Sequence, residues 1–250
     1  MQITIDMNMN NINDLLITEK EPMTENRLGL SFANTIRSRT SCRAFLPTPV
    51  SNEVITSVLE DAQLSPSNCN SQPWITHIVS GAKLAQLSQA ILKANTESSF
   101  TPDFSFDQNC FYGEYAERSM AQGKAYYQGL GVAREDVASR QTAVDLNYTF
   151  FNAPQVALLF MPSFGDNVRV AGDIGMYGQS FLLSLTDHGL AGVPQTSLGF
   201  FAATIRETLG ISDDQKLLFG ISFGYADKNA PGSRIEISRV PISDSVTFHS

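Results

Sequence analysis

The stretch that decides the fold is Ser65-Pro66-Ser67-Asn68-Cys69-Asn70-Ser71-Gln72-Pro73-Trp74. Serine, asparagine and proline favour turns, so residues 65–74 are predicted to form a tight loop. Before the loop, apolar side chains recur at helical spacing over residues 54–62, and Ser51 is placed to cap that helix. After the loop, the alternating, β-branched run of residues 75–79 predicts a strand. The chain therefore passes from a helix through a turn-rich loop into a sheet.

Helices and strands alternate along the rest of the chain. A short helix over residues 28–36 is predicted to run into a basic cluster at residues 37–43. Residues 98–127 are irregular and aromatic, with a helical second half. The remaining predicted elements are a helix over 83–95, a helix opening at 134–136, a strand over 156–161, a helix over 173–188 and a strand over 216–223. This order predicts one central sheet with helices, in an α+β or α/β fold.

The predicted helix over residues 173–188 is nearly uncharged, which predicts burial on all sides. Gly172, Gly175 and Gly178 recur in it at a spacing of three and leave one stripe without side chains. This spacing indicates close packing against a neighbouring element or a second subunit. Phosphate binding is the weaker interpretation, because no strand immediately precedes the glycines as a dinucleotide-binding motif requires.

Composition excludes several classes of function. The 250 residues include 17 Lys and Arg against 25 Asp and Glu, a formal net charge of −8, which argues against nucleic acid and anionic membranes as partners. The 3 Cys and 3 His are scattered, which disfavours disulfides, zinc sites and His-dependent triads and favours a reducing cytoplasm. No metal site is therefore expected. Residues 1–16 carry Asp6 and many Asn, so we expect no export signal, and no spanning helix is expected either.

Three kinds of chemical site are open from the residues alone. Cys69 lies in the turn-rich loop, but no histidine is placed to act as its base, so an ordinary loop cysteine is the favoured interpretation. Adjacent acidic pairs point in different directions from a helix and are typical of solvated faces. Arginines form the third kind, because a guanidinium binds phosphate with two parallel hydrogen bonds. Either a phosphate site or a solvated basic patch would explain Arg37, Arg39, Arg43, Arg234 and Arg239.

Three blocks of this sequence resemble the FMN-dependent nitroreductase family. The first is the run of residues 39–45, Arg-Thr-Ser-Cys-Arg-Ala-Phe, and the second is the stretch 65–74. The resemblance runs from about Phe32 to the carboxyl terminus. The third block is Ala153-Pro154, Asp173-Ile174-Gly175, Gly189-Leu190, Val193-Pro194-Gln195, Gly224-Tyr225-Ala226-Asp227, Arg239 and Pro241.

The resemblance implies an α+β fold with a central, mostly antiparallel sheet flanked by helices. It further implies an intertwined homodimer with two FMN molecules at the subunit interface, each contacted by both chains. Because no linker divides the chain, residues 28–250 are expected to form a single FMN-binding domain after a flexible arm of residues 1–27.

The resemblance also assigns site residues. Arg39 and Ser41 would contact the ribityl and phosphate groups, Arg239 would clamp the phosphate, and Arg43 would lie near N1 and O2 of the ring. Pro66, Ser67 and Asn70 would come from the partner chain. The backbone amides of Thr196 and Ser197 would face N5 and O4, and no side chain is expected to be catalytic. The full implied set is Arg39, Thr40, Ser41, Arg43, Pro66, Ser67, Asn68, Asn70, Gln72, Pro194, Gln195, Thr196, Ser197 and Arg239. Ile237 and Ser233 depart from the family pattern.

The implied activity is hydride transfer from NADPH or NADH through flavin N5 to a nitroaromatic, quinone or similar planar acceptor, in ping-pong order. Two alternatives stay open: a flavoenzyme with another reaction, such as dehydrogenation, dehalogenation or flavin destruction, and a flavin-storage protein without turnover. The aromatic side chains of residues 100–127 either cover the exposed flavin face or belong to the core and the dimer interface.

Overall fold

The computed structural model describes residues 27–231, 233, 235 and 237–250. Its centre is a four-stranded sheet in the order β1-β2-β4-β3, and every neighbouring pair is antiparallel. The expected α+β fold with a mostly antiparallel sheet is therefore confirmed. The strands are β1 (Ile75–Ser80), β2 (Gln155–Met161), β3 (Ala191–Gln195) and β4 (Lys216–Gly224).

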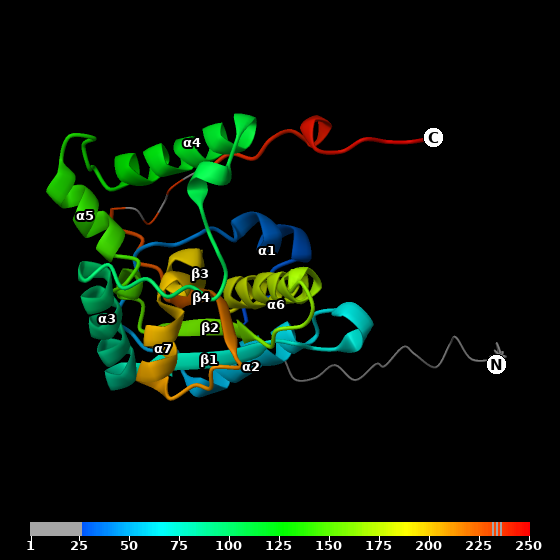
Figure 1. Cartoon of the computed structure of the whole chain (residues 1–250). Helices are drawn as coiled ribbons and strands as arrows, with labels where there is room; N and C mark the ends of the chain where they lie inside the picture. The colour runs from blue at the N-terminus through cyan, green and yellow to red at the C-terminus, as the bar shows by residue number, and fades with distance from the viewer. Residues whose placement is uncertain (1–26, 232, 234, 236) are drawn as a thin grey trace.

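Helices cover both faces of the sheet (Figure 1). Helices α2 and α6 pack together on one face, and α3 and α7 pack together on the other. Helix α4, of 17 residues, lies apart from these layers, above α1 and α6 in Figure 1. The helices are α1 (Phe32–Ser38), α2 (Asn52–Gln63), α3 (Gly81–Thr96), α4 (Gly113–Gly129), α5 (Val137–Asp145), α6 (Val168–Asp187) and α7 (Ala202–Leu209).

Strand β2 divides the hydrophobic core into two clusters. Its residues are buried throughout, and successive side chains point to opposite faces of the sheet. Val156, Leu158 and Phe160 join the cluster beneath α3 and α7, whereas Leu159 and Met161 join the cluster beneath α2 and α6. A strand buried on both faces explains why residues 156–161 read as a continuous apolar run.

Capping side chains mark the start of α1, α2 and α5. The hydroxyl of Ser51 accepts a hydrogen bond from the Val54 N–H and caps α2, as predicted. The Asp136 carboxylate caps α5 in the same way by accepting from the Ser139 N–H at 2.9 Å. Strand β3 was not predicted, because it contains Gly192 and Pro194 and depends on pairing with β4.

The predicted all-round burial of the glycine-rich helix is wrong for this chain alone. Helix α6 begins at Val168, earlier than predicted, and its side towards the sheet is buried. Gly178 is the closely packed glycine, since a Cβ there would come within 2.9 Å of the Phe219 ring. Gly172, Gly175 and Met176 are exposed on the opposite side. A helix with so few charged residues and one exposed face would be stabilised by a further covering surface, which the described residues do not supply.

The expected amino-terminal arm lies outside the described residues except for its last residue. Arg27 belongs to the folded part, because it forms ion pairs with Asp61 of α2 at 2.9 Å and with Asp187 of α6 at 3.5 Å. The Leu28 N–H donates to the Asp187 carbonyl at 2.6 Å. In the part of the chain that the structure describes, no helix is both long and apolar enough to cross a membrane.

Candidate functional site

A cavity of about 940 Å³ opens between α1, α4, α6, the end of β3 and the carboxyl-terminal tail. Its size lies at the upper end of the range for small-molecule and cofactor sites. It gathers part of the implied site from three distant segments of the chain. The implied residues that line it are Arg39, Thr40, Ser41, Arg43, Pro194 and Arg239.

The segment after α1 is held at the edge of the sheet. The Arg39 N–H closes α1 by donating to the Thr35 carbonyl at 3.1 Å. Ser41 then forms a parallel bridge with Gly192 of β3, and the Cys42 N–H donates to the Gly192 carbonyl at 3.3 Å. Cys42 is buried in the core. The alternation along this short extended segment therefore leaves Ser41 and Arg43 to line the cavity.

Positive charges gather in the cavity, and no described acidic residue lines it. Burial lowers the pKa of Arg39, and the nearby charge of Arg239 lowers it further. Arg239 donates to the carbonyls of Ile237 and Ser238 at 3.0 and 3.3 Å. Within the described ranges, neither guanidinium forms an ion pair with a carboxylate. Two guanidinium groups that repel each other in a cavity fit a doubly charged phosphate group.

Arg43 occupies a different environment in the same cavity. Its guanidinium lies 5.4 Å from the centre of the Tyr126 ring, and burial lowers the pKa of the Arg43 side chain. Burial also raises the pKa of Tyr126 to about 12, and the Tyr126 hydroxyl donates to the Ala143 carbonyl at 2.8 Å. The ring therefore stays neutral and supports the Arg43 charge through a cation–π contact.

The decisive loop, residues 65–74, is held by α6. The Asn68 N–H donates to both oxygens of the buried Asp173 carboxylate at 3.1 and 3.2 Å. The Ser65 hydroxyl donates to the Ser180 hydroxyl at 2.7 Å. The 3-10 turn η2 (Asn68–Asn70) has left-handed backbone at Cys69, and Gln72 is left-handed as well. The implied residues Pro66, Ser67, Asn68, Asn70 and Gln72 do not line the cavity of their own chain.

The turn that follows β3 alternates between the cavity and the core. Pro194 lines the cavity, and Thr196 is exposed at the start of the 3-10 helix η5 (Thr196–Phe201). Gln195 between them is buried, and its side chain bonds to Asn147 and Ser222. Of Gln195, therefore, only the backbone is available to a bound molecule.

Some cavity residues escaped the sequence reasoning. Gln122 of α4 and Gln179 of α6 both line the cavity, and so does Arg37, which was predicted only as a member of the basic cluster. Gln122 could not be identified because the segment 98–127 matches no motif. Gln179 lies one turn of helix beyond the exposed glycines, so the helical period of α6 was the signal that could have found it. Arg234 falls outside the described residues.

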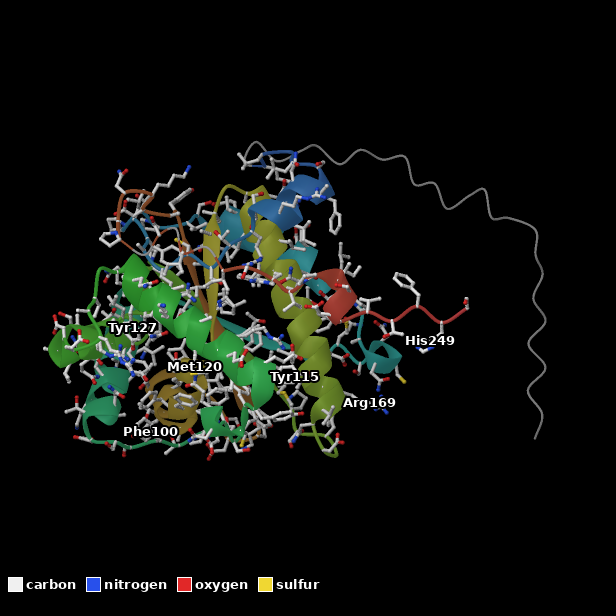
Figure 2. The ribbon with its side chains drawn as sticks, turned by 90° about the horizontal axis from the view of Figure 1, so that it is seen from above. Phe100, Tyr115, Met120, Tyr127, Arg169 and His249 are labelled. Carbon is white, nitrogen blue, oxygen red and sulfur yellow. The ribbon has the colours of Figure 1, made fainter. Side chains whose placement is uncertain are left out.

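Aromatic residues of the segment 100–127 divide between core and surface. Tyr126 is buried, and Phe100 packs against Phe201 with ring centres 5.5 Å apart. Tyr112 and Tyr115 are exposed. Figure 2 shows Tyr115, Met120 and Tyr127 spread along α4, seen from above. In the described part of the chain none of these rings lines the cavity, so their covering of a flavin stays a prediction.

The other candidate chemical sites are Cys69, the histidines and the acidic pairs. Cys69 is exposed, and its Sγ lies 3.9 Å from the Asn68 side-chain oxygen. The histidines are engaged elsewhere: His77 with Gln215 at 2.9 Å, and His188 with the Ser184 carbonyl at 2.9 Å. The acidic pairs supply Asp61 to Arg27, Asp136 to a helix cap and Asp213 to Arg206.

Comparisons with known proteins agree with the fold. A sequence model of the Nitroreductase family matches residues 36–225. Nitroreductase NfnB of Mycolicibacterium smegmatis is 40% identical over 213 residues, which are 85% of this chain and 90% of that protein. The 4-nitrobenzoate reductase of Pseudomonas putida is 33% identical over 210 residues, which are 83% of this chain and 91% of that protein. The crystal structure of the FMN-dependent nitroreductase NfnB from Mycobacterium smegmatis in complex with NADPH has a TM-score of 0.84 at 39% identity, and the match covers 87% of this chain and 97% of that chain. This chain therefore belongs to the nitroreductase family.

Proposed function

We propose that this protein is an FMN-dependent NADPH oxidoreductase that reduces nitroaromatic compounds. The observation that carries the proposal is the cavity with Arg39 and Arg239, whose charges repel each other unless an anion lies between them. The phosphate group of FMN is such an anion. When bound, FMN supplies the redox chemistry by accepting a hydride at N5 and passing it to the acceptor. Similar proteins named as an FMN-dependent nitroreductase and as 4-nitrobenzoate reductases support the cofactor and the substrate class.

The residues of this chain would bind the FMN phosphate, orient the flavin ring and stabilise its reduced form. Arg39 and Arg239 would hold the phosphate, with Ser41 beside them as a hydrogen-bond donor. Arg43, supported by the neutral Tyr126, would place a fixed positive charge beside the part of the ring that becomes negative on reduction. The segment from Pro194 to Ser197 would present backbone donors to the ring. Because the chemistry belongs to the cofactor, no side chain needs to act as a nucleophile.

A homodimer is part of the proposal. The exposed stripe of α6 with Gly172, Gly175 and Met176 would be covered by a second copy. That copy would also bring its loop 65–74 to this chain's cavity, which explains why the loop residues do not line the cavity of their own chain. Residues 28–250 would form the single catalytic domain, and cytoplasmic localisation stays a prediction.

An anaerobic titration tests the proposal. The purified protein should be yellow, and NADPH added without oxygen should bleach the flavin band, which 4-nitrobenzoate should then restore. Restoration after NADPH has been removed would support ping-pong order. A colourless protein that does not bind added FMN would contradict the proposal. Failure of both NADPH and NADH to bleach bound flavin would favour storage, and restoration by a quinone but not by a nitroaromatic would change the acceptor.

A further inference from the structure

Gln195 has both ends of its side-chain amide engaged inside the protein. The Gln195 side chain is 3% exposed. Its Nε2 donates to the Asn147 carbonyl at 2.9 Å, and its Oε1 accepts a hydrogen bond from the Ser222 hydroxyl. Ser222 is fully buried on β4. The amide thus ties the end of β3 both to the neighbouring strand and to the chain that follows α5.

The chain that follows α5 is a fixed anchor. Three successive residues there, Phe150, Phe151 and Asn152, have left-handed backbone, with φ of 56°, 54° and 61°. Phe150 and Phe151 are buried, and the Phe151 N–H donates to the Leu146 carbonyl at 2.7 Å. Such a conformation persists only where the surrounding packing determines it. Asn147, at the start of this turn, is therefore a rigid partner for β3.

The anchored residues lie next to the cavity wall. Pro194, immediately before Gln195, lines the cavity, and Thr196 follows it on the exposed side. The Ser197 hydroxyl donates to the Asn147 side-chain oxygen at 3.4 Å. Asn147 therefore contacts residues on both sides of Thr196, and the backbone between them is held at two points.

We propose that Gln195 is a positioning residue for flavin reduction: with Ser222 and Asn147 it sets the place of the 194–197 backbone against the cofactor. This inference rests on the proposed function, since the cofactor is what the backbone would face. The side chain at this position must carry both a donor and an acceptor, because one end donates to a carbonyl while the other accepts from a hydroxyl, and a primary amide carries both at every pH. A displacement of about 1 Å at a reacting centre can cost on the order of a hundredfold in rate.

Gln155 provides a matched control in the same sheet. It is also buried, with 4% exposure, and its amide also has both ends engaged. Its Nε2 donates to the Val50 carbonyl at 2.8 Å, and its Oε1 accepts from the Val50 N–H at 3.1 Å. It starts β2 and does not line the cavity around Arg39. Replacing either glutamine by methionine removes two side-chain hydrogen bonds and leaves a side chain of similar volume.

The experiment compares Gln195→Met with Gln155→Met in the FMN-loaded protein. Both variants should lose thermal stability to a similar extent. Only Gln195→Met should change the flavin absorption spectrum and midpoint potential, and only it should slow bleaching by NADPH, by about tenfold or more, with little change in KM for NADPH. Equal flavin spectra, potentials and bleaching rates in the two variants would overturn the inference. A wild-type protein that binds no FMN would instead contradict the proposed function.

Gln195→Glu gives a second test that does not depend on the methionine variant folding. A protonated carboxyl group keeps both the donor and the acceptor, whereas a carboxylate loses the donor and repels the Asn147 carbonyl. Burial favours the protonated form. The flavin spectrum of this variant should therefore match that of the wild type at low pH and depart from it as the pH rises. The same pH dependence in the wild type, or none in the variant, would count against the positioning role.

Discussion

At the scale of single residues, the cavity is defined by arginines that form no ion pair with a carboxylate of the described residues. Burial and the charge of Arg239 both lower the pKa of Arg39, so the two guanidinium groups repel each other unless an anion lies between them. A bound phosphate would remove this repulsion and would gain charge-assisted hydrogen bonds, each worth about 1.5–3 kcal/mol. Affinity for an anion and stability of the free protein are thus opposed at these two positions.

Arg239→Ala is expected to weaken FMN binding by about ten- to a hundredfold, because one charged hydrogen-bonding partner of the phosphate is lost. The free protein should not lose stability, because the repulsion between Arg239 and Arg39 is relieved. FMN affinity can be measured by fluorescence titration, and stability by thermal unfolding without FMN. Lys93→Ala, an exposed cation on α3, is the control. Undiminished FMN retention would show that the phosphate lies elsewhere.

Cys69→Ser should leave FMN binding and flavin reduction unchanged. The thiol is exposed, and its side-chain contact is with the Asn68 amide oxygen, which cannot act as a general base. Bleaching of the flavin band by NADPH measures the outcome. A variant that retains FMN but is no longer reduced would revive the cysteine as a reactive group.

At the scale of elements, α6 has one face that packs on the sheet and an opposite face that is exposed. Its inner face packs on the sheet so closely that Gly178 leaves no room for a side chain. Its outer face is exposed and carries one charged residue, Arg169, with no described atom near a Cβ built on Gly172 or Gly175. The same glycine spacing therefore serves internal packing on one side and remains available for an interface on the other.

Gly178→Ala should destabilise the protein by about 1–3 kcal/mol, because the new methyl group would lie 2.9 Å from the Phe219 ring and 3.3 Å from the Leu159 side chain. Gly175→Ala meets no described atom of the same chain within 4 Å beyond its own helix turn, and should not destabilise the fold of the single chain. Denaturant unfolding of the two variants tests this contrast. Equal loss of stability in both would contradict the packing described for α6.

Gly175→Leu extends the contrast to the interface. A large side chain is tolerated by the open space in one chain but would separate two copies that approach along α6. We expect sedimentation to show a shift from dimer to monomer together with loss of FMN. A dimer that keeps its FMN would show that the partner does not pack on this stripe.

At the scale of the whole molecule, the implied site is divided between two surfaces of one chain. Arg39, Arg43 and Arg239 line the cavity, whereas Ser67 and Asn70 lie on a loop held by Asp173 of α6. In the homodimer that we propose, a second copy would bring these two surfaces together in a closed, symmetric assembly.

Mixing two variants with damaged FMN sites tests whether each site is built from two chains. Arg239→Ala damages the cavity, and a double variant with Ser67→Ala and Asn70→Ala damages the loop. Refolding the two together in equal amounts should restore about a quarter of the wild-type activity, because about half of the dimers would be mixed and each would hold one intact site of two. Activity of flavin reduction is the readout. No recovery after mixing, with dimers present, would place both sets of residues in one chain's site.

The sequence alone predicted most of the helices and three of the four strands that the structure describes, and missed β3 and α7. Helical spacing, the Ser51 cap and the apolar run of β2 depend on neighbours in the chain, so they could be predicted from it. Residues 39–43 and the loop 65–74 were identified by their resemblance to a family.

Only the tertiary structure decided which of those residues meet. It brought Arg39 next to Arg239, formed β3 by pairing with β4, and turned the Gln195 side chain into the core. It also showed that α6 is buried on one side only. These features arise from contacts between segments far apart in the chain, and such contacts leave no periodic or local pattern in the sequence.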